Sequence, residues 1–174
     1  SRESKPVSIK TFKLFTKDSS VTDDTTLTVA IAEWMLDRKG VDVGQSLIKW
    51  ATEYPHAGYG SSFKRFLANG SHVTPGSTHN GAVVRVSPVG YLASSLEECL
   101  DLARESALPS HDSPQAIAGA KAAAAAIYLA RTGSSKEEIR DYLEAEFVYN
   151  LHRSYDEVRE EVRHARATRE TDYE

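Results

Sequence analysis

The chain contains very little cysteine and no long hydrophobic run. Its 174 residues include one cysteine, Cys99, which excludes a disulfide framework and a thiolate metal cluster within the chain. Because Cys99 lies beside Leu100 and follows Leu96, it is expected to be a small buried hydrophobic residue rather than a nucleophile. No apolar segment is long enough to span a bilayer, and no secretory signal is visible. We therefore expect a cytoplasmic protein without membrane association.

An excess of positive charge is also missing. The chain has 21 Lys and Arg residues against 25 Asp and Glu residues, for a net charge of −4 and a pI near 5.9. No basic stripe is present, which argues against a nucleic-acid partner. Repeats and low-complexity linkers are absent as well, so residues 1–174 are expected to form a single domain with a substantial core.

Most periodic segments of the sequence are typical of amphipathic helices. Apolar residues recur at intervals of three and four, which predicts an all-α fold. The expected helices cover about residues 23–37, 42–53, a short segment after 58–60, 96–103, 115–131, 136–147 and 156–167. Capping boxes are predicted at 95–98 and 135–138. The segment 81–93 is rich in β-branched residues, which favour strands, so the sequence does not exclude a strand there.

The last predicted helix carries a dense charged face. Val158, Val162 and Ala165 follow a helical spacing on its other side. This spacing predicts that the three residues point inward against the rest of the domain.

Two adjacent carboxylates, Asp23 and Asp24, precede the first apolar helical stretch. Thr22 stands before them and Thr25 after them. Acidic residues are favoured in a first helical turn by the unpaired N–H groups and the helix dipole, so capping alone accounts for any one of these residues. Two neighbouring carboxylates repel each other, however, and a hard cation relieves that repulsion. Both interpretations, a helix cap and a metal site, remain open at this point.

Three segments together resemble the ADP-ribosylglycohydrolase family, which includes the glycohydrolase that reactivates dinitrogenase reductase. The order and spacing of these segments agree with the family over nearly the whole chain. They are Thr22-Asp23-Asp24-Thr25, the segment 80–90 (Asn-Gly-Ala-Val-Val-Arg-Val-Ser-Pro-Val-Gly), and Ser110-His111-Asp112-Ser113-Pro114 before an alanine-rich helix.

The resemblance implies a compact orthogonal bundle of helices around two magnesium ions, with manganese as an alternative ion. In the family a Thr-Asp-Asp triplet supplies metal ligands, and the resemblance implies this role for Thr22, Asp23 and Asp24. The family's second ligand motif, Asp-x-Asp-Thr, does not occur in this sequence, nor does its opening Gly-Asp-x-x-Gly segment. The bundle is therefore expected to be incomplete at both ends. A truncated chain, a partial gene product and the ordered part of a longer protein all stay open as explanations.

The resemblance also implies an activity. The expected protein is a magnesium-dependent hydrolase that cleaves N- or O-glycosidic ADP-ribosyl bonds and reverses protein ADP-ribosylation, with ADP-ribose or an ADP-ribosylated protein as partner. Asp23 and Asp24 would act at the reaction centre, and Glu3 is a loose match to the family's catalytic glutamate. Glutamates near a chain end are usually just solvated. The alternative is an inactive member that binds ADP-ribose or is structural, which the missing second motif favours.

Substrate contacts are implied for two loops. The first includes Ser77, His79, Asn80 and Gly81, whose backbone N–H groups would cradle ADP-ribose. The second contains His111, which would reach the ribose or a water molecule on the metal. Without the resemblance, an ordinary turn at Asn80-Gly81 is an equally good interpretation, and a histidine beside a capping residue is more often structural. Arg85 lies in an apolar segment and is expected to be an internal partner of a carboxylate rather than a ligand contact.

Overall fold

Helices make up the regular structure of the chain, as the sequence predicts. The computed structural model describes residues 16–17, 19–37, 40–70 and 77–171, without the side chains of 166–171, and these ranges contain no strand. In chain order the helices are α1 (Asp23–Leu36), α2 (Val43–Glu53), α3 (Ser61–Ala68), α4 (Gly81–Val84), α5 (Ser87–Leu92), α6 (Leu96–Ala107), α7 (Pro114–Arg131), α8 (Lys136–Phe147) and α9 (Tyr155–Thr171). The all-α prediction is confirmed.

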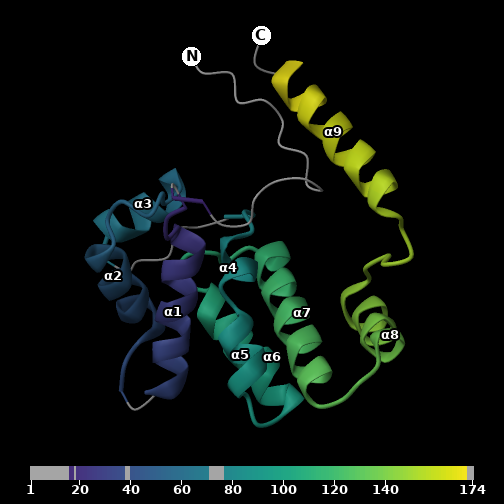
Figure 1. Cartoon of the computed structure of the whole chain (residues 1–174), viewed down its shortest axis with the longest axis horizontal. Helices are drawn as coiled ribbons and strands as arrows, with labels where there is room; N and C mark the ends of the chain where they lie inside the picture. Colours follow the sequence, from purple (N-terminus) through teal and green to yellow (C-terminus); the bar gives the residue numbers. More distant parts are fainter. Residues whose placement is uncertain (1–15, 18, 38–39, 71–76, 172–174) are drawn as a thin grey trace.

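The apolar stripe of α1 faces the core, as its spacing predicts. Its members are all at most 7% exposed, and they are Leu27, Ala30, Ile31, Trp34 and Met35. Helix α2 packs beside α1 and runs in the opposite direction, at one side of the molecule (Figure 1). The two helices are joined by a buried hydrogen bond in which Ser46 Oγ donates to the Ala30 carbonyl at 2.8 Å. This bond ties the middle of α1 to the first turn of α2.

The segment 81–93 forms two short helices, α4 and α5, rather than a strand. Both helices pack on α7, and α5 also packs on α1 (Figure 1). The approach of α5 to α7 is so close that a Cβ on Gly90 would lie 2.5 Å from the Ala124 carbonyl oxygen. The small residues of α7 permit this approach.

Cys99 is fully buried in α6, as predicted. Desolvation raises the pKa of its thiol to about 11, so the thiol is protonated near neutral pH. Its role in the structure is packing rather than chemistry.

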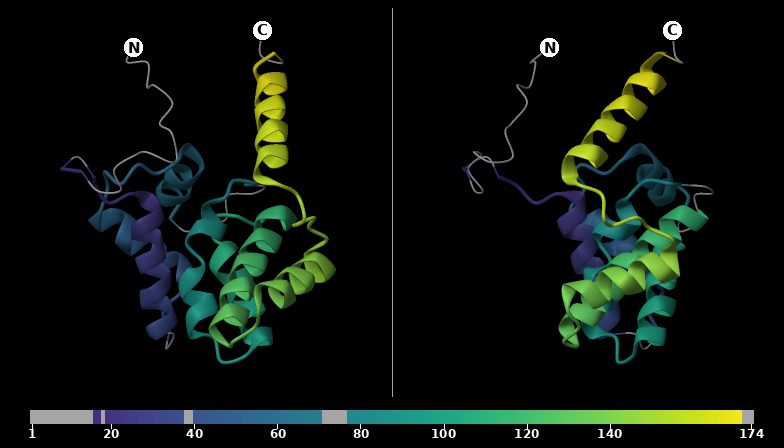
Figure 2. Two further views of the ribbon diagram at one scale, coloured as in Figure 1. Left: turned by 45° about the vertical axis from the view of Figure 1, so that its right-hand side comes forward. Right: turned by 90° about the vertical axis from the view of Figure 1, so that its right-hand side faces the viewer.

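The C-terminal helices differ from the rest. A complete capping box of Ser135 and Glu138 begins α8, as predicted. Helix α9 projects away from the other helices (Figure 2). Val158 is 42% exposed and Val162 46% exposed, and Ala165 is exposed as well. The inward orientation predicted for these three residues is therefore wrong, because no neighbouring helix of the described chain covers that face.

Among the described residues, no helix combines the length and the apolar character needed to cross a bilayer.

Candidate active site

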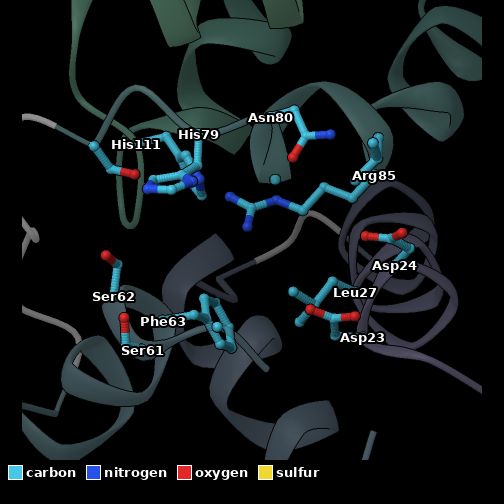
Figure 3. A pocket seen from close by; sticks show the side chains of 14 residues that line it. Asp23, Asp24, Leu27, Ser61, Ser62, Phe63, His79, Asn80, Arg85 and His111 are labelled. Carbon is cyan, nitrogen blue, oxygen red and sulfur yellow. The ribbon is translucent and has the colours of Figure 1, made fainter. Parts of the chain in front are cut away.

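A cavity of about 270 Å³ opens where the starts of α1, α3 and α4 meet the loop between α6 and α7 (Figure 3). Most of the residues that the sequence nominated line this cavity. They are Asp23, Asp24, Ser77, His79, Asn80, Gly81 and His111. The predicted Thr22 does not line it, and Glu3 lies outside the described residues. Four segments distant in sequence thus converge on one space.

The acidic pair occupies the first turn of α1. Thr22 is the N-cap, with extended backbone angles (φ −107°, ψ 173°) and no hydrogen bond from its side chain to the helix. The Asp23 amide donates to the Ala57 carbonyl at 2.7 Å, which ties this turn to the segment before α3. Asp23 is half-buried and Asp24 is exposed, and neither forms an ion pair with another described residue. Both carboxylates are therefore available to the cavity.

The two loops opposite α1 are joined to each other. Ser113 caps α7 by accepting a hydrogen bond from the Ala116 amide at 3.2 Å, and its hydroxyl donates to the Ser77 carbonyl at 2.8 Å. The Ser77 hydroxyl itself is buried and has no hydrogen-bond partner. The bond between Ser113 and Ser77 holds the loop before α4 against the start of α7. Local capping chemistry thereby positions the residues that follow Ser77.

His111 lies against the backbone of α4. Its ring is 6% exposed, and a Cβ built on Gly81 would lie 2.8 Å from Cε1 and 2.9 Å from Nε2. Only glycine leaves room for the ring at this position. Burial, together with the charges of Arg85 and His79, lowers the pKa of His111 to about 4, although Asp112 opposes this shift. His111 is therefore neutral at physiological pH.

Arg85 is an internal residue, as the sequence predicts, but its partners differ from the predicted carboxylate. Its side chain is fully buried, and its guanidinium points into the space between the imidazoles and the acidic pair (Figure 3). The Nη2 group donates to the Ser106 carbonyl at 2.7 Å and to Ser110 Oγ at 2.8 Å, while Nε and Nη1 have no partner. Within the described residues no carboxylate pairs with it, contrary to the prediction. Burial lowers the pKa of Arg85 to about 10, so the guanidinium stays charged at neutral pH.

The described residues offer two carboxylates for a metal ion and no larger ligand set. No group of three or more His, Cys, Asp and Glu side chains is assembled among them. Magnesium is commonly held by one or two carboxylates, with water molecules and substrate phosphates as its other ligands. Asp23 and Asp24 at the cavity edge fit such an ion. They do not by themselves provide the ligands that a pair of ions requires.

Sequence reasoning missed the rest of the cavity wall. The cavity is also lined by Leu27 of α1, by Val84 of α4 and by Arg85, which follows α4. The start of α3 contributes Gly60, Ser61, Ser62 and Phe63. The apolar members, Leu27 and Phe63, are part of the same periodic stripes that form the core, so periodicity cannot tell them apart from core residues. Tyr59 packs on Phe63, with ring centroids 5.4 Å apart.

Comparison with known proteins identifies a family and two relatives. The family model described as ADP-ribosylglycohydrolase matches residues 2–174. The chain is 31% identical over 134 residues to ADP-ribosylhydrolase ARH3 of Mus musculus, an alignment that covers 67% of this chain and 36% of the relative. ADP-ribosylhydrolase ARH3 of Homo sapiens is also 31% identical over 134 residues, with 67% of this chain and 37% of the relative covered. The chain thus spans little more than a third of the length of these relatives.

Proposed function

The chain belongs to the ADP-ribosylglycohydrolase family, and from this premise we propose that its cavity binds ADP-ribose and takes part in the magnesium-dependent hydrolysis of ADP-ribosyl glycosidic bonds. The observation that carries the proposal is the convergence of Asp23 and Asp24 with His79, Asn80 and His111 on one cavity (Figure 3). Acidic and hydrogen-bonding walls facing each other suit a ligand that combines ribose hydroxyls, phosphates and an apolar base.

Each wall of the cavity has a part in this function. Asp23 and Asp24, with Thr22 beside them, would hold Mg²⁺, which when bound offsets negative charge on the ligand and polarises the bond to be cleaved. His111 is neutral and available as a hydrogen-bond partner for a ligand oxygen. Leu27 and Phe63 provide an apolar surface for the ring systems of the ligand. The reversal of protein ADP-ribosylation is the physiological role that this chemistry would serve.

Hydrolysis of ADP-ribosyl-serine and ADP-ribosyl-arginine peptides, with and without a chelator, tests the proposal. We expect turnover in the presence of Mg²⁺ and a loss of about 100-fold or more in Asp23→Asn/Asp24→Asn, because the ion loses both of its carboxylate ligands. The matched control is Asp156→Asn, which removes an exposed first-turn carboxylate from α9, far from the cavity in sequence. Activity that survives both the chelator and the double substitution would reject the metal assignment.

A second function is favoured by the small metal-ligand set. Because the described residues assemble no group of three metal-binding side chains, a non-catalytic protein that binds ADP-ribose fits the same cavity. Calorimetry with ADP-ribose separates the two functions. Binding without turnover in the peptide assay would support the non-catalytic role, whereas turnover would exclude it.

A further inference from the structure

The hydrogen bonds around His111 form a chain that begins at Arg85. The guanidinium Nη2 of Arg85 uses its two hydrogens to donate to the Ser106 carbonyl and to Ser110 Oγ, at 2.7 and 2.8 Å. Ser110 Oγ in turn lies 2.8 Å from Nδ1 of His111. Arg85, Ser110 and His111 are 0%, 2% and 6% exposed, so solvent offers little competition for these bonds.

The direction of this chain follows from the chemistry of arginine. A guanidinium only donates hydrogen bonds, so Ser110 Oγ is an acceptor toward Arg85. The hydroxyl hydrogen of Ser110 then needs its own acceptor, and the remaining recorded neighbour of Oγ in the described chain is His111 Nδ1. A proton on Nδ1 would leave a buried hydroxyl hydrogen without an acceptor, which is costly. Nδ1 therefore carries the lone pair, and Nε2 carries the proton.

The protonated nitrogen lies on the side of the ring next to Gly81, a residue that lines the cavity. The Nε2 and Cε1 edge of the ring lies beside Gly81, and His111 lines the cavity together with His79 (Figure 3). No hydrogen bond to Nε2 is recorded from the described residues. The charged and titratable groups that act on the ring are Arg85 and His79, which disfavour its protonation, and Asp112, which favours it.

We propose that Arg85 and Ser110 are positioning residues that fix His111 as the neutral Nε2–H tautomer. In this state His111 donates a hydrogen bond to an acceptor oxygen of the ligand, either a phosphate or a ribose oxygen, and serves neither as a base nor as a metal ligand. A metal ion or a proton would need a lone pair, and the only lone pair of the ring is already occupied by Ser110. This assignment of a ligand oxygen rests on the proposed function, whereas the tautomer itself does not.

The two nitrogens of His111 can be observed directly by long-range ¹H–¹⁵N NMR of histidine-labelled protein. The spectra are recorded without ADP-ribose and without Mg²⁺, and the signals are assigned with His111→Gln. We expect wild-type His111 to be protonated at Nε2 and bare at Nδ1 from pH 8 down to about pH 5.5, where an ordinary histidine titrates. A proton on Nδ1, or a mixture of tautomers, would overturn the proposal.

Ser110→Ala and Ser106→Ala provide a matched pair. Both replace a buried serine near the end of α6, and the Ser106 hydroxyl donates to the Ala103 carbonyl outside the chain of bonds to His111. Because a hydrogen bond to the neutral ring is lost, we expect Ser110→Ala to raise the titration midpoint of His111 by about one pH unit, and Ser106→Ala to leave it unchanged. Identical midpoints in the two variants would contradict the positioning role. If Ser110→Ala does not fold, the wild-type tautomer decides the question alone.

ADP-ribose binding to the same variants tests the proposed hydrogen bond from His111 to an oxygen of the ligand. We expect Ser110→Ala to weaken Kd by about 3- to 10-fold, the usual loss for one hydrogen bond, with Ser106→Ala near wild type. Equal Kd values in both variants would contradict the donor role of His111. A wild-type protein that does not bind ADP-ribose would instead refute the proposed function, with the tautomer still decided by the ligand-free spectra.

Discussion

The two walls of the cavity are built in opposite ways. The acidic wall consists of Asp23 and Asp24 at the first turn of α1, half-buried and exposed, without ion pairs to other described residues. The opposite wall includes Arg85 and His111, which are connected by hydrogen bonds through Ser110, and all three residues are buried. The side chains of the buried wall are held by hydrogen bonds within the protein, whereas the carboxylates of the acidic wall have no ion-pair partner among the described residues and are left to a ligand.

This contrast separates two kinds of residue that both line the site. A side chain on the buried wall holds the fold and the site together, so its loss is expected to affect both. A carboxylate on the acidic wall contributes to the site and little to the fold. Measurements of unfolding free energy alongside ligand binding therefore test whether the two walls differ as the structure indicates.

The largest expected effect on stability is that of Arg85→Ala. The substitution leaves a cavity and deprives the Ser106 carbonyl of a buried donor, so the free energy of unfolding should fall by about 3–5 kcal/mol. Urea denaturation monitored by circular dichroism measures this change.

Arg85→Met sharpens the same test. Methionine retains much of the volume but none of the hydrogen bonds, so we expect a smaller loss of about 1–3 kcal/mol. A loss below about 1 kcal/mol in both variants would show that Arg85 is not a structural member of the buried wall.

An intermediate effect is expected for Gly81→Ala. The new Cβ would lie 2.8 Å from the His111 ring, and this overpacking should cost about 1–3 kcal/mol and displace the imidazole. Thermal unfolding gives the stability, and the His111 NMR signals report the displacement.

Gly60→Ala is the matched control, because Gly60 also lines the cavity but has nothing within 4 Å of its Cβ position. Its φ of −65° suits alanine, so the change should be neutral or slightly stabilising. If Gly60→Ala destabilises the protein as much as Gly81→Ala does, contact with His111 is not the cause.

The sequence was informative wherever local rules decide the structure. The apolar spacing of α1 predicted an inward face, on which five apolar residues are buried, and Ser135 and Glu138 predicted the capping box of α8. Three motifs distant in the chain pointed to one site, and the structure brings residues from each of them to one cavity. Local pattern was sufficient in these cases because helix caps and amphipathic faces depend on nearby residues.

The sequence failed where the outcome depends on a neighbour distant in the chain. An isolated arginine in an apolar run predicts a carboxylate partner, but Arg85 is bound by the Ser106 carbonyl and the Ser110 hydroxyl, which no pattern around residue 85 reveals. The face of α9 has the spacing of a buried stripe, yet Val158 and Val162 are exposed because no helix of the described chain covers them. Periodicity identifies a face, and tertiary structure decides whether it is covered.

The smallest expected effect on stability is that of Asp23→Asn/Asp24→Asn in the absence of Mg²⁺. Each carboxylate gains about 0.3–1 kcal/mol from the helix dipole, and their mutual repulsion offsets part of this gain, so the net change should stay below about 1 kcal/mol. Urea denaturation in the presence of a chelator provides the measurement. Added Mg²⁺ should then stabilise the wild-type protein, by about 1.4 kcal/mol at ten times its Kd, but not the double variant. A loss above about 2 kcal/mol with the chelator present would mean that the acidic wall also supports the fold, and the two walls would then differ in exposure alone.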